Sequence, residues 1–259
     1  MQFQVLGCFG NIGNGHNTTS FLVDDDILID AGSGLSTLSL EALSKIDHVF
    51  LSHTHMDHIA LLPMLADATV SQRTKPIVVH GTKSTLDTLS DHIFNWDVYP
   101  DFRKICLADH AAIEFSVFEP DMPMTIKCRQ GGDRHLSAIP VVHSIPTVAF
   151  HLSSGTGSLV VATDMTVSDT FWPAVNAIDD LRYLLIETAF QDARLDLCEP
   201  AGHLCPSMLR AELLKLEQSP EIFIVHMKTS AEPQIRKEIA ALNLDFDIRF
   251  LADGNILNI

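Results

Sequence analysis

The stretch HVFLSHTHMDH, residues 48–58, decides the fold of this chain. A short apolar run leads into four side chains of metal-binding type within six residues, namely His53, His55, Asp57 and His58. Residues two apart at the end of an extended strand project to one side, and the start of a helix brings the aspartate and the third histidine back toward the same pocket. The spacing therefore predicts a metal site where a strand gives way to a helix.

Three more residues of the same kind follow apolar strands further along the chain. His143 comes after AIPVV, Asp164 after SLVVAT and His226 after EIFIV. A strand end holds a side chain rigidly, whereas the loop beyond it leaves room for a substrate. Because two metals that share a hydroxide need roughly seven or eight ligands, these residues and the first four together favour a binuclear centre.

Short runs rich in Val and Ile alternate with helical patterns along the whole sequence. Strands of this kind are buried on both faces, so helices must cover them, which predicts one layered α/β domain over residues 1–259. The predicted strands are 2–6, 19–23, 27–30, 48–52, 77–80, 138–142, 147–152, 158–163, 183–187, 222–226 and 248–251. The predicted helices are 38–44, 57–67, 83–93, 168–179, 206–218 and 232–242.

The composition is that of a folded, acidic chain. Hydrophobic residues make up 46% of the 259 residues, and 17 Lys and Arg against 33 Asp and Glu give a net charge of −16. This charge repels nucleic-acid backbones and anionic membranes, so we expect neither as a partner. No apolar run approaches the roughly 20 residues of a membrane helix. The five cysteines form no CxxC pair, which favours free thiols in the cytoplasm.

Several segments together resemble the metallo-β-lactamase superfamily. The segments FQVLGCFGN (3–11), NTTSFLV (17–23) and ILIDAG (27–32) are similar to its opening strands, and SHTHMDH (52–58) to its signature. The resemblance implies a four-layer αββα sandwich. It further implies that one metal is bound by His53, His55 and His143, that the other is bound by Asp57, His58 and His226, and that Asp164 bridges the two.

Within that superfamily the sequence resembles the class II cyclic-nucleotide phosphodiesterases. The matching segments are HIFN (92–95), YPDF (99–102), ETAF (187–190), GHLCP (202–206) and VHMK (225–228). The chain departs from the family at Met56, at Ala60 and at ATDM (162–165), which stands where the family has GDTG. The resemblance implies hydrolysis of 3′,5′-cyclic nucleotides to 5′ monophosphates through a metal-bridging hydroxide. We take cyclic AMP as the favoured substrate, although the sequence leaves the choice between adenine and guanine open.

Other residues are assigned roles around that reaction. We predict three catalytic residues, namely Asp57, Glu187 and His203, of which Asp57 is also a metal ligand. A glutamate that holds one imidazole nitrogen leaves the other nitrogen free to protonate the leaving alkoxide, although a local structural role for the pair is the alternative. His92 and Asn95 lie three apart on one helical face, so we interpret them as substrate-binding residues or as residues that join the helix to the core.

Imidazole-rich ligation favours two zinc ions, with manganese or iron as alternatives. The expected partner is a small cyclic nucleotide, and a homodimer is an open alternative to a monomer. Two rival functions use the same metals, namely an RNA 3′-processing nuclease and a lactonase. The nuclease needs a basic docking arm, which a chain of charge −16 does not offer. A third rival, a non-catalytic cyclic-nucleotide-binding protein, has no need for seven metal ligands.

Overall fold

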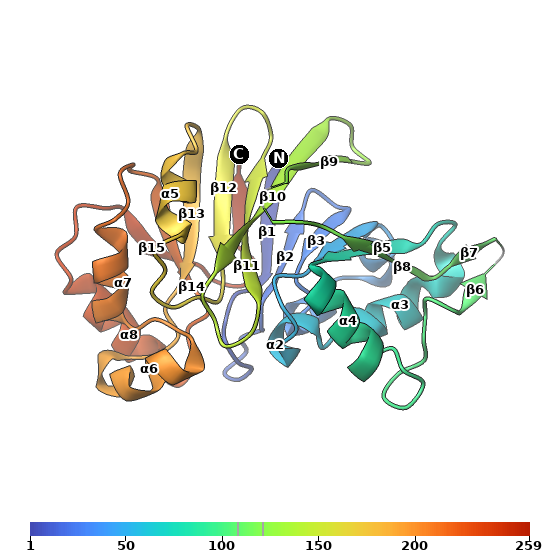
Figure 1. The fold of residues 1–259 in the computed structure, drawn as a ribbon, viewed down its shortest axis with the longest axis horizontal. Helices are drawn as coiled ribbons and strands as arrows, with labels where there is room; N and C mark the ends of the chain where they lie inside the picture. The colour runs from blue at the N-terminus through green and yellow to red at the C-terminus, as the bar shows by residue number, and fades with distance from the viewer. Residues whose placement is uncertain (108, 121) are drawn as a thin grey trace.

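The computed structural model describes residues 1–107, 109–120 and 122–259. Two seven-stranded mixed sheets pack face to face, and helices cover both outer faces, as Figure 1 shows. The predicted four-layer αββα sandwich is confirmed.

The first sheet has the order β16-β1-β2-β3-β4-β5-β8. Its strands are β1 (Gln2–Gly7), β2 (Ser20–Val23), β3 (Ile27–Ile29), β4 (His48–Phe50), β5 (Ile77–Gly81), β8 (Ile113–Val117) and β16 (Ile256–Asn258). The strands from β3 to β8 are parallel, whereas β16, β1, β2 and β3 pair antiparallel. The first half of the chain therefore builds this sheet, and the last strand completes its edge.

The second sheet has the order β15-β14-β13-β12-β11-β10-β9. Its strands are β9 (Met124–Lys127), β10 (Asp133–Val141), β11 (Thr147–Ser153), β12 (Ser158–Ala162), β13 (Leu181–Glu187), β14 (Glu221–Val225) and β15 (Ile248–Phe250). Strands β12 to β15 are parallel, and β9 to β12 pair antiparallel. A small separate sheet pairs β6 (Cys106–Leu107) with β7 (His110–Ala111).

The helices fall into two groups on opposite sides of the sandwich (Figure 1). The group beside the first sheet includes α2 (Met56–Ile59), α3 (Leu62–Thr69) and α4 (Lys83–His92), and α1 (Leu40–Leu43) contacts α3. The group beside the second sheet is α5 (Phe171–Asn176), α6 (Leu195–Ala201), α7 (Pro206–Leu213) and α8 (Glu232–Ala240). No helix of the described residues is long and apolar enough to span a membrane.

The alternation of side chains along each strand makes the layered core. In β3, Ile27 and Ile29 belong to the core between the two sheets, while Leu28 belongs to the core between the first sheet and its helices. Successive residues of a strand point to opposite faces, so a strand that is apolar throughout fills both cores. The same alternation places Phe50 against Phe150 of the second sheet, with ring centroids 6.1 Å apart.

The strand directions bring the predicted site together. Strands β12, β13 and β14 are parallel, and β10 runs the same way because two antiparallel pairings separate it from β12. Their carboxyl ends therefore lie at one edge of the second sheet, where ligands commonly bind in such folds. The loop after β4 of the first sheet reaches the same edge, near α2 (Figure 1).

Several predicted elements differ from the observed ones. The predicted helix 57–67 is two helices, α2 and α3, with a break at residues 60–61. The predicted helix 168–179 shrinks to Phe171–Asn176, and 206–218 ends at Leu213. Strands β6, β7, β8, β9 and β16 and helix α6 were not predicted. The reason for the missed strands is their position, because each lies at the edge of a sheet.

Candidate metal centre

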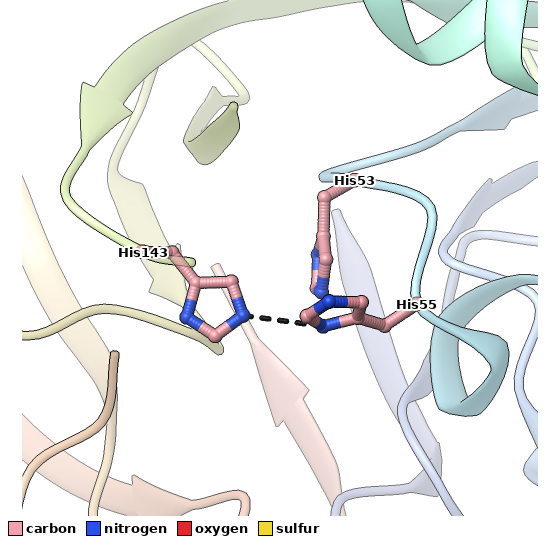
Figure 2. Close-up of side chains that lie close together, drawn as sticks. All are labelled: His53, His55 and His143. Carbon is pink, nitrogen blue, oxygen red and sulfur yellow. Dashed lines mark hydrogen bonds between the residues drawn. The ribbon is translucent and has the colours of Figure 1, made fainter. Parts of the chain in front are cut away.

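The centre is built from the loop after β4, from α2 and from the ends of three strands of the second sheet. Figure 2 shows His53 and His55 on the loop after β4 facing His143, which follows β10. His55 Nδ1 and His143 Nε2 are 3.2 Å apart. The two sheets therefore contribute to one cluster of side chains.

Asp164 lies at the middle of this cluster. Its Oδ2 is 3.0 Å from His58 Nε2, and its Oδ1 is 3.2 Å from His226 Nε2. The same Oδ1 lies 3.8 Å from His143 Nε2 and 3.9 Å from His53 Nε2. A carboxylate that faces imidazoles of both halves has the geometry of a bridging ligand.

The ligand atoms group into overlapping sets, in each of which all atoms lie within 4.8 Å of one another. The sets are His53, His55 and His143; Asp57, His58 and His226; His53, His58 and Asp164; and His143, Asp164 and His203. The first two sets match the two predicted metal sites, and the third joins them through Asp164. The fourth set places His203 close enough to be a donor itself, which the sequence did not indicate.

Unsatisfied buried atoms test whether metals fit here. Within the described residues, the Nε2 atoms of His53, His58 and His226 and the Oδ2 atom of Asp164 make no aligned hydrogen bond. A buried polar atom without a partner costs roughly 1–3 kcal/mol. Four such atoms facing one another fit divalent cations, and the imidazole and carboxylate donors suit zinc, manganese or iron.

The charges of the cluster reinforce this arrangement. Burial lowers the pKa of His53 and of His226, which keeps both imidazoles neutral. Burial by itself disfavours the ionised form of Asp164, but its contact with His58 helps hold the pKa of its carboxyl well below the usual range. Against the effect of burial, Asp164 and Asp30 raise the pKa of His58, which must give up a proton to bind a metal. Neutral imidazoles and an ionised carboxylate are the forms that ligate metals.

Asp30 supports the cluster from behind, and the sequence analysis assigned it no role. Its Oδ2 accepts from His58 Nδ1 at 2.7 Å, and its Oδ1 accepts from the Ser52 amide at 2.8 Å. Metal-binding histidines commonly donate their other ring nitrogen to a carboxylate in this way, which fixes the ring and its tautomer. The only sequence signal was an aspartate at the end of the apolar strand ILID.

Two glycines permit the close packing of the metal-facing rings. A Cβ on Gly10 would lie 2.7 Å from the His226 carbonyl oxygen and 2.9 Å from its Nε2. Gly202 has a φ of 73°, and its carbonyl oxygen accepts from His143 Nδ1 at 2.8 Å. This bond leaves Nε2 of His143 directed at the cluster. A Cβ on Gly202 would lie 2.9 Å from His143 Nδ1, so a side chain at either glycine would displace a metal-facing ring.

Glu187 and His203 form the pair that the sequence predicts. Glu187 Oε1 lies 2.7 Å from His203 Nδ1, and the buried carboxylate also accepts from the backbone amides of Met165, Ala189 and Leu204. Burial raises the pKa of Glu187, and Glu187 in turn raises the pKa of His203 against the effect of burial. The His203 ring centroid is 5.0 Å from that of His143, so its free nitrogen is at the cluster.

The remaining candidate substrate residues make their contacts elsewhere. His92 is exposed at the end of α4. Asn95 Nδ2 donates to the Asp91 carbonyl, and Asn95 Oδ1 accepts from the amides of residues 97 and 98, so its amide holds its own turn. His16, which the sequence places in the turn GNGHN (13–17) near the expected site, stacks on Phe9 with ring centroids 3.7 Å apart, and its Nε2 is 3.2 Å from Glu232. The structure does not bring these three residues into the metal cluster.

Comparison with known proteins places the chain in a family. The model of the beta-lactamase superfamily domain matches residues 25–227. The chain therefore belongs to this superfamily.

Particular relatives are similar over most of the chain. A probable metallo-hydrolase, YhfI of Bacillus subtilis, is 25% identical over 92% of each chain. A probable 3′,5′-cyclic-nucleotide phosphodiesterase of Yersinia pestis is 25% identical over 82% of this chain and 71% of its own. A ribonuclease Z of Treponema pallidum is 29% identical over 51% of this chain and 52% of its own.

Solved structures share the fold. The crystal structure of unliganded yeast PDE1 superposes with a TM-score of 0.78 at 17% identity and covers 100% of this chain and 99% of its own. At this identity the likeness concerns the fold alone, and the chemistry has to be argued from the residues.

Proposed function

We propose that this chain is a binuclear metal-dependent phosphodiesterase that hydrolyses 3′,5′-cyclic nucleotides, cyclic AMP first among them, to 5′ monophosphates. The observation that carries the proposal is the position of Asp164, within 3.0 to 3.9 Å of four imidazole nitrogens drawn from both sheets. A protein that only binds a nucleotide has no need for such a centre.

Each residue has a distinct task in this proposal. One divalent metal would be held by His53, His55 and His143. The other would be held by Asp57, His58 and His226, and Asp164 would contact both metals. When bound, two such metals activate water near neutral pH and neutralise charge on the phosphoryl oxygens. Zinc is the metal that the imidazole-rich donor set favours.

The Glu187–His203 pair would handle the proton of the leaving group. Glu187 accepts from Nδ1 of His203, which fixes the tautomer and leaves Nε2 as the second nitrogen. An alkoxide is a poor leaving group, so a proton delivered from Nε2 to the departing 3′ oxygen would accelerate ring opening. Asp57 would serve both as a ligand of the second metal and as a polar neighbour of the reacting water.

The substrate class is supported by two further lines. The segments at 92–95, 187–190, 202–206 and 225–228 resemble the cyclic-nucleotide phosphodiesterases, and relatives of Yersinia pestis and Aliivibrio fischeri carry that name. The net charge of −16 disfavours a polynucleotide. A ribonuclease-type activity is the second candidate, because relatives named ribonuclease Z match about half of the chain.

Turnover of a substrate panel tests the proposal. Protein loaded with zinc, manganese or iron would be assayed on 3′,5′-cyclic AMP, 3′,5′-cyclic GMP, 2′,3′-cyclic nucleotides, bis(p-nitrophenyl) phosphate, a lactone and precursor tRNA. We expect cyclic AMP to yield adenosine 5′ monophosphate. Cyclic nucleotides that stay intact with every metal while precursor tRNA is cleaved would establish the second candidate instead.

The variant Asp164→Ala links the centre to that activity. Removal of the bridge should abolish turnover and lower the metal content below the roughly two ions of a binuclear site. Asp169→Ala is the matched control, because Asp169 is exposed and its ion pair within the described part of the chain is with Lys215, 3.1 Å away. Full metal content and full activity in Asp164→Ala would refute the assignment.

A further inference from the structure

A cavity of about 360 Å³ lies beside the metal centre. Phe190, which lines it, has its ring centroid 5.8 Å from that of His203. Lys228, on another wall, donates from Nζ to the Gly10 carbonyl oxygen at 2.6 Å. Because the Gly10 backbone packs on the ring of His226, the cavity borders the cluster on the side of His203.

The charge of this cavity is opposite to that of the whole chain. Among the described residues, its lining includes Arg194 and Lys228 but no aspartate or glutamate, although the chain has 33 acidic against 17 basic residues. Arg194 Nε lies 3.7 Å from the exposed carboxylate of Asp196. A loose ion pair of that kind contributes little and leaves the guanidinium available.

Five other cations of the chain are held by two buried carboxylates. Asp47 alone pairs with Arg73, Lys75 and Arg129 at 2.6 to 2.8 Å. Arg103 and Lys104 are held in the same way by Asp101 at 2.7 and 3.0 Å. The two cations beside the metal centre are thus not neutralised in this manner.

The neutral residues of the cavity add hydrogen-bond donors. Asn11 Oδ1 accepts from the Thr229 amide at 2.8 Å, which directs the Nδ2 group of Asn11 to other partners. Gln191 and Ser230 also line the cavity, and an amide and a hydroxyl can each donate to an oxyanion. Donors and cations without carboxylates are the chemistry that recognises phosphate.

We propose that this cavity is an anion subsite, which binds a second phosphate group of the substrate while its phosphodiester is cleaved at the metal centre. The inference rests on the phosphodiester cleavage of the proposed function and goes beyond its proposed substrate. Cyclic AMP has no phosphate outside the scissile diester, so the subsite adds nucleotides that carry a second phosphate. A compound with one phosphate then uses the metal centre alone, and a compound with two uses both sites.

Inhibition by product-like nucleotides tests the subsite. Hydrolysis of bis(p-nitrophenyl) phosphate by the metal-loaded protein would be inhibited with adenosine 5′-monophosphate and with adenosine 3′,5′-bisphosphate. The second compound should inhibit more strongly, by roughly fivefold for each partly exposed cation that it contacts. In Arg194→Glu this advantage should disappear, whereas Arg210→Glu, an exposed position on α7, should retain it.

Equal inhibition by the two nucleotides in the wild type would overturn the subsite, as would an unchanged advantage in Arg194→Glu. Calorimetric titration of the same nucleotides gives this ratio without any turnover. The ratio is independent of cyclic AMP hydrolysis. A protein that leaves cyclic AMP intact but shows the Arg194-dependent ratio would therefore refute the proposed substrate and support the subsite.

Discussion

Replacement of Asp30 by asparagine should weaken metal binding at His58 while the fold persists. Asp30 accepts three hydrogen bonds, from the Ser52 amide at 2.8 Å, from Ser52 Oγ at 2.7 Å and from His58 Nδ1 at 2.7 Å. Asparagine keeps an acceptor for the Ser52 amide, but its NH₂ group cannot accept from the imidazole. His58 would then lose the partner that fixes its tautomer.

The expected size of the effect on metal binding follows from the lost contact with His58. Loss of such a carboxylate partner commonly costs 10- to 100-fold in metal affinity, which corresponds to about 1.4–2.8 kcal/mol. Competition with a chromophoric chelator should show that the affinity for one of the two metals falls by that factor. The affinity for the ion at His53, His55 and His143 should change less. Asp169→Asn is the matched control on the surface.

The reasoning would be refuted by two full-affinity metals in Asp30→Asn. A urea titration of the metal-free protein separates this outcome from unfolding. A variant that is folded, as its unfolding transition shows, and still binds both metals normally would show that Asp30 only joins strands and does not orient His58.

Three further changes have expected outcomes. His203→Ala should slow cyclic AMP by roughly 10²- to 10⁴-fold but keep most activity on bis(p-nitrophenyl) phosphate, whose leaving group needs no proton. Gly10→Ala should release the metal ion at His226, as measured by elemental analysis, because its Cβ would lie 2.9 Å from the ring nitrogen. Burial, and then His48, lowers the pKa of His80 to about 3. Below about pH 6.5 the unfolded chain therefore binds one more proton at this histidine than the folded chain does. The free energy of unfolding should fall by about 2 kcal/mol between pH 7 and 5 for this reason. His80→Gln should remove that loss, as measured by urea titrations at the two pH values.

Each of these expectations has a contrary result. Equal losses on both substrates in His203→Ala, with metals retained, would make that histidine a positioning residue. Full metal content in Gly10→Ala would mean that the loop yields without moving His226, and Gly157→Ala is its control because the added Cβ meets only ordinary contact, 3.4 Å away. An unchanged pH dependence in His80→Gln would place the proton uptake on other groups.

Most of the cluster could be predicted from the sequence because its residues adjoin strands that are apolar throughout. A local pattern marks His53 to His58, and a single polar residue after an apolar run marks Asp164 and His226. Asp30 has that same mark in ILID, but one carboxylate after a strand does not indicate what it contacts. Its partner, His58, is 28 residues away, and only the parallel pairing of β3 with β4 brings them together.

The elements that escaped prediction are those with less burial to reveal them. In strand β8, IEFSV, and strand β9, MTIK, polar or charged residues alternate with apolar ones because one face of each strand is partly exposed. Helix α6 contains Pro200 near its end, which weakens the helical pattern. No sequence pattern marks Gly10. A side chain is excluded at this position by the ring of His226, which lies more than 200 residues later in the chain.

Because the ligands come from both sheets, the affinity of the metal centre depends on how the two sheets pack against each other. His53 and His58 come from the first half of the fold, whereas Asp164 and His226 come from the second, and side-chain packing sets the spacing between them. A substitution such as Phe50→Leu, buried in the core against Phe150 at 6.1 Å, changes no ligand. It would nevertheless shift one sheet against the other, so metal affinity would measure the tightness of a core that the ions never touch.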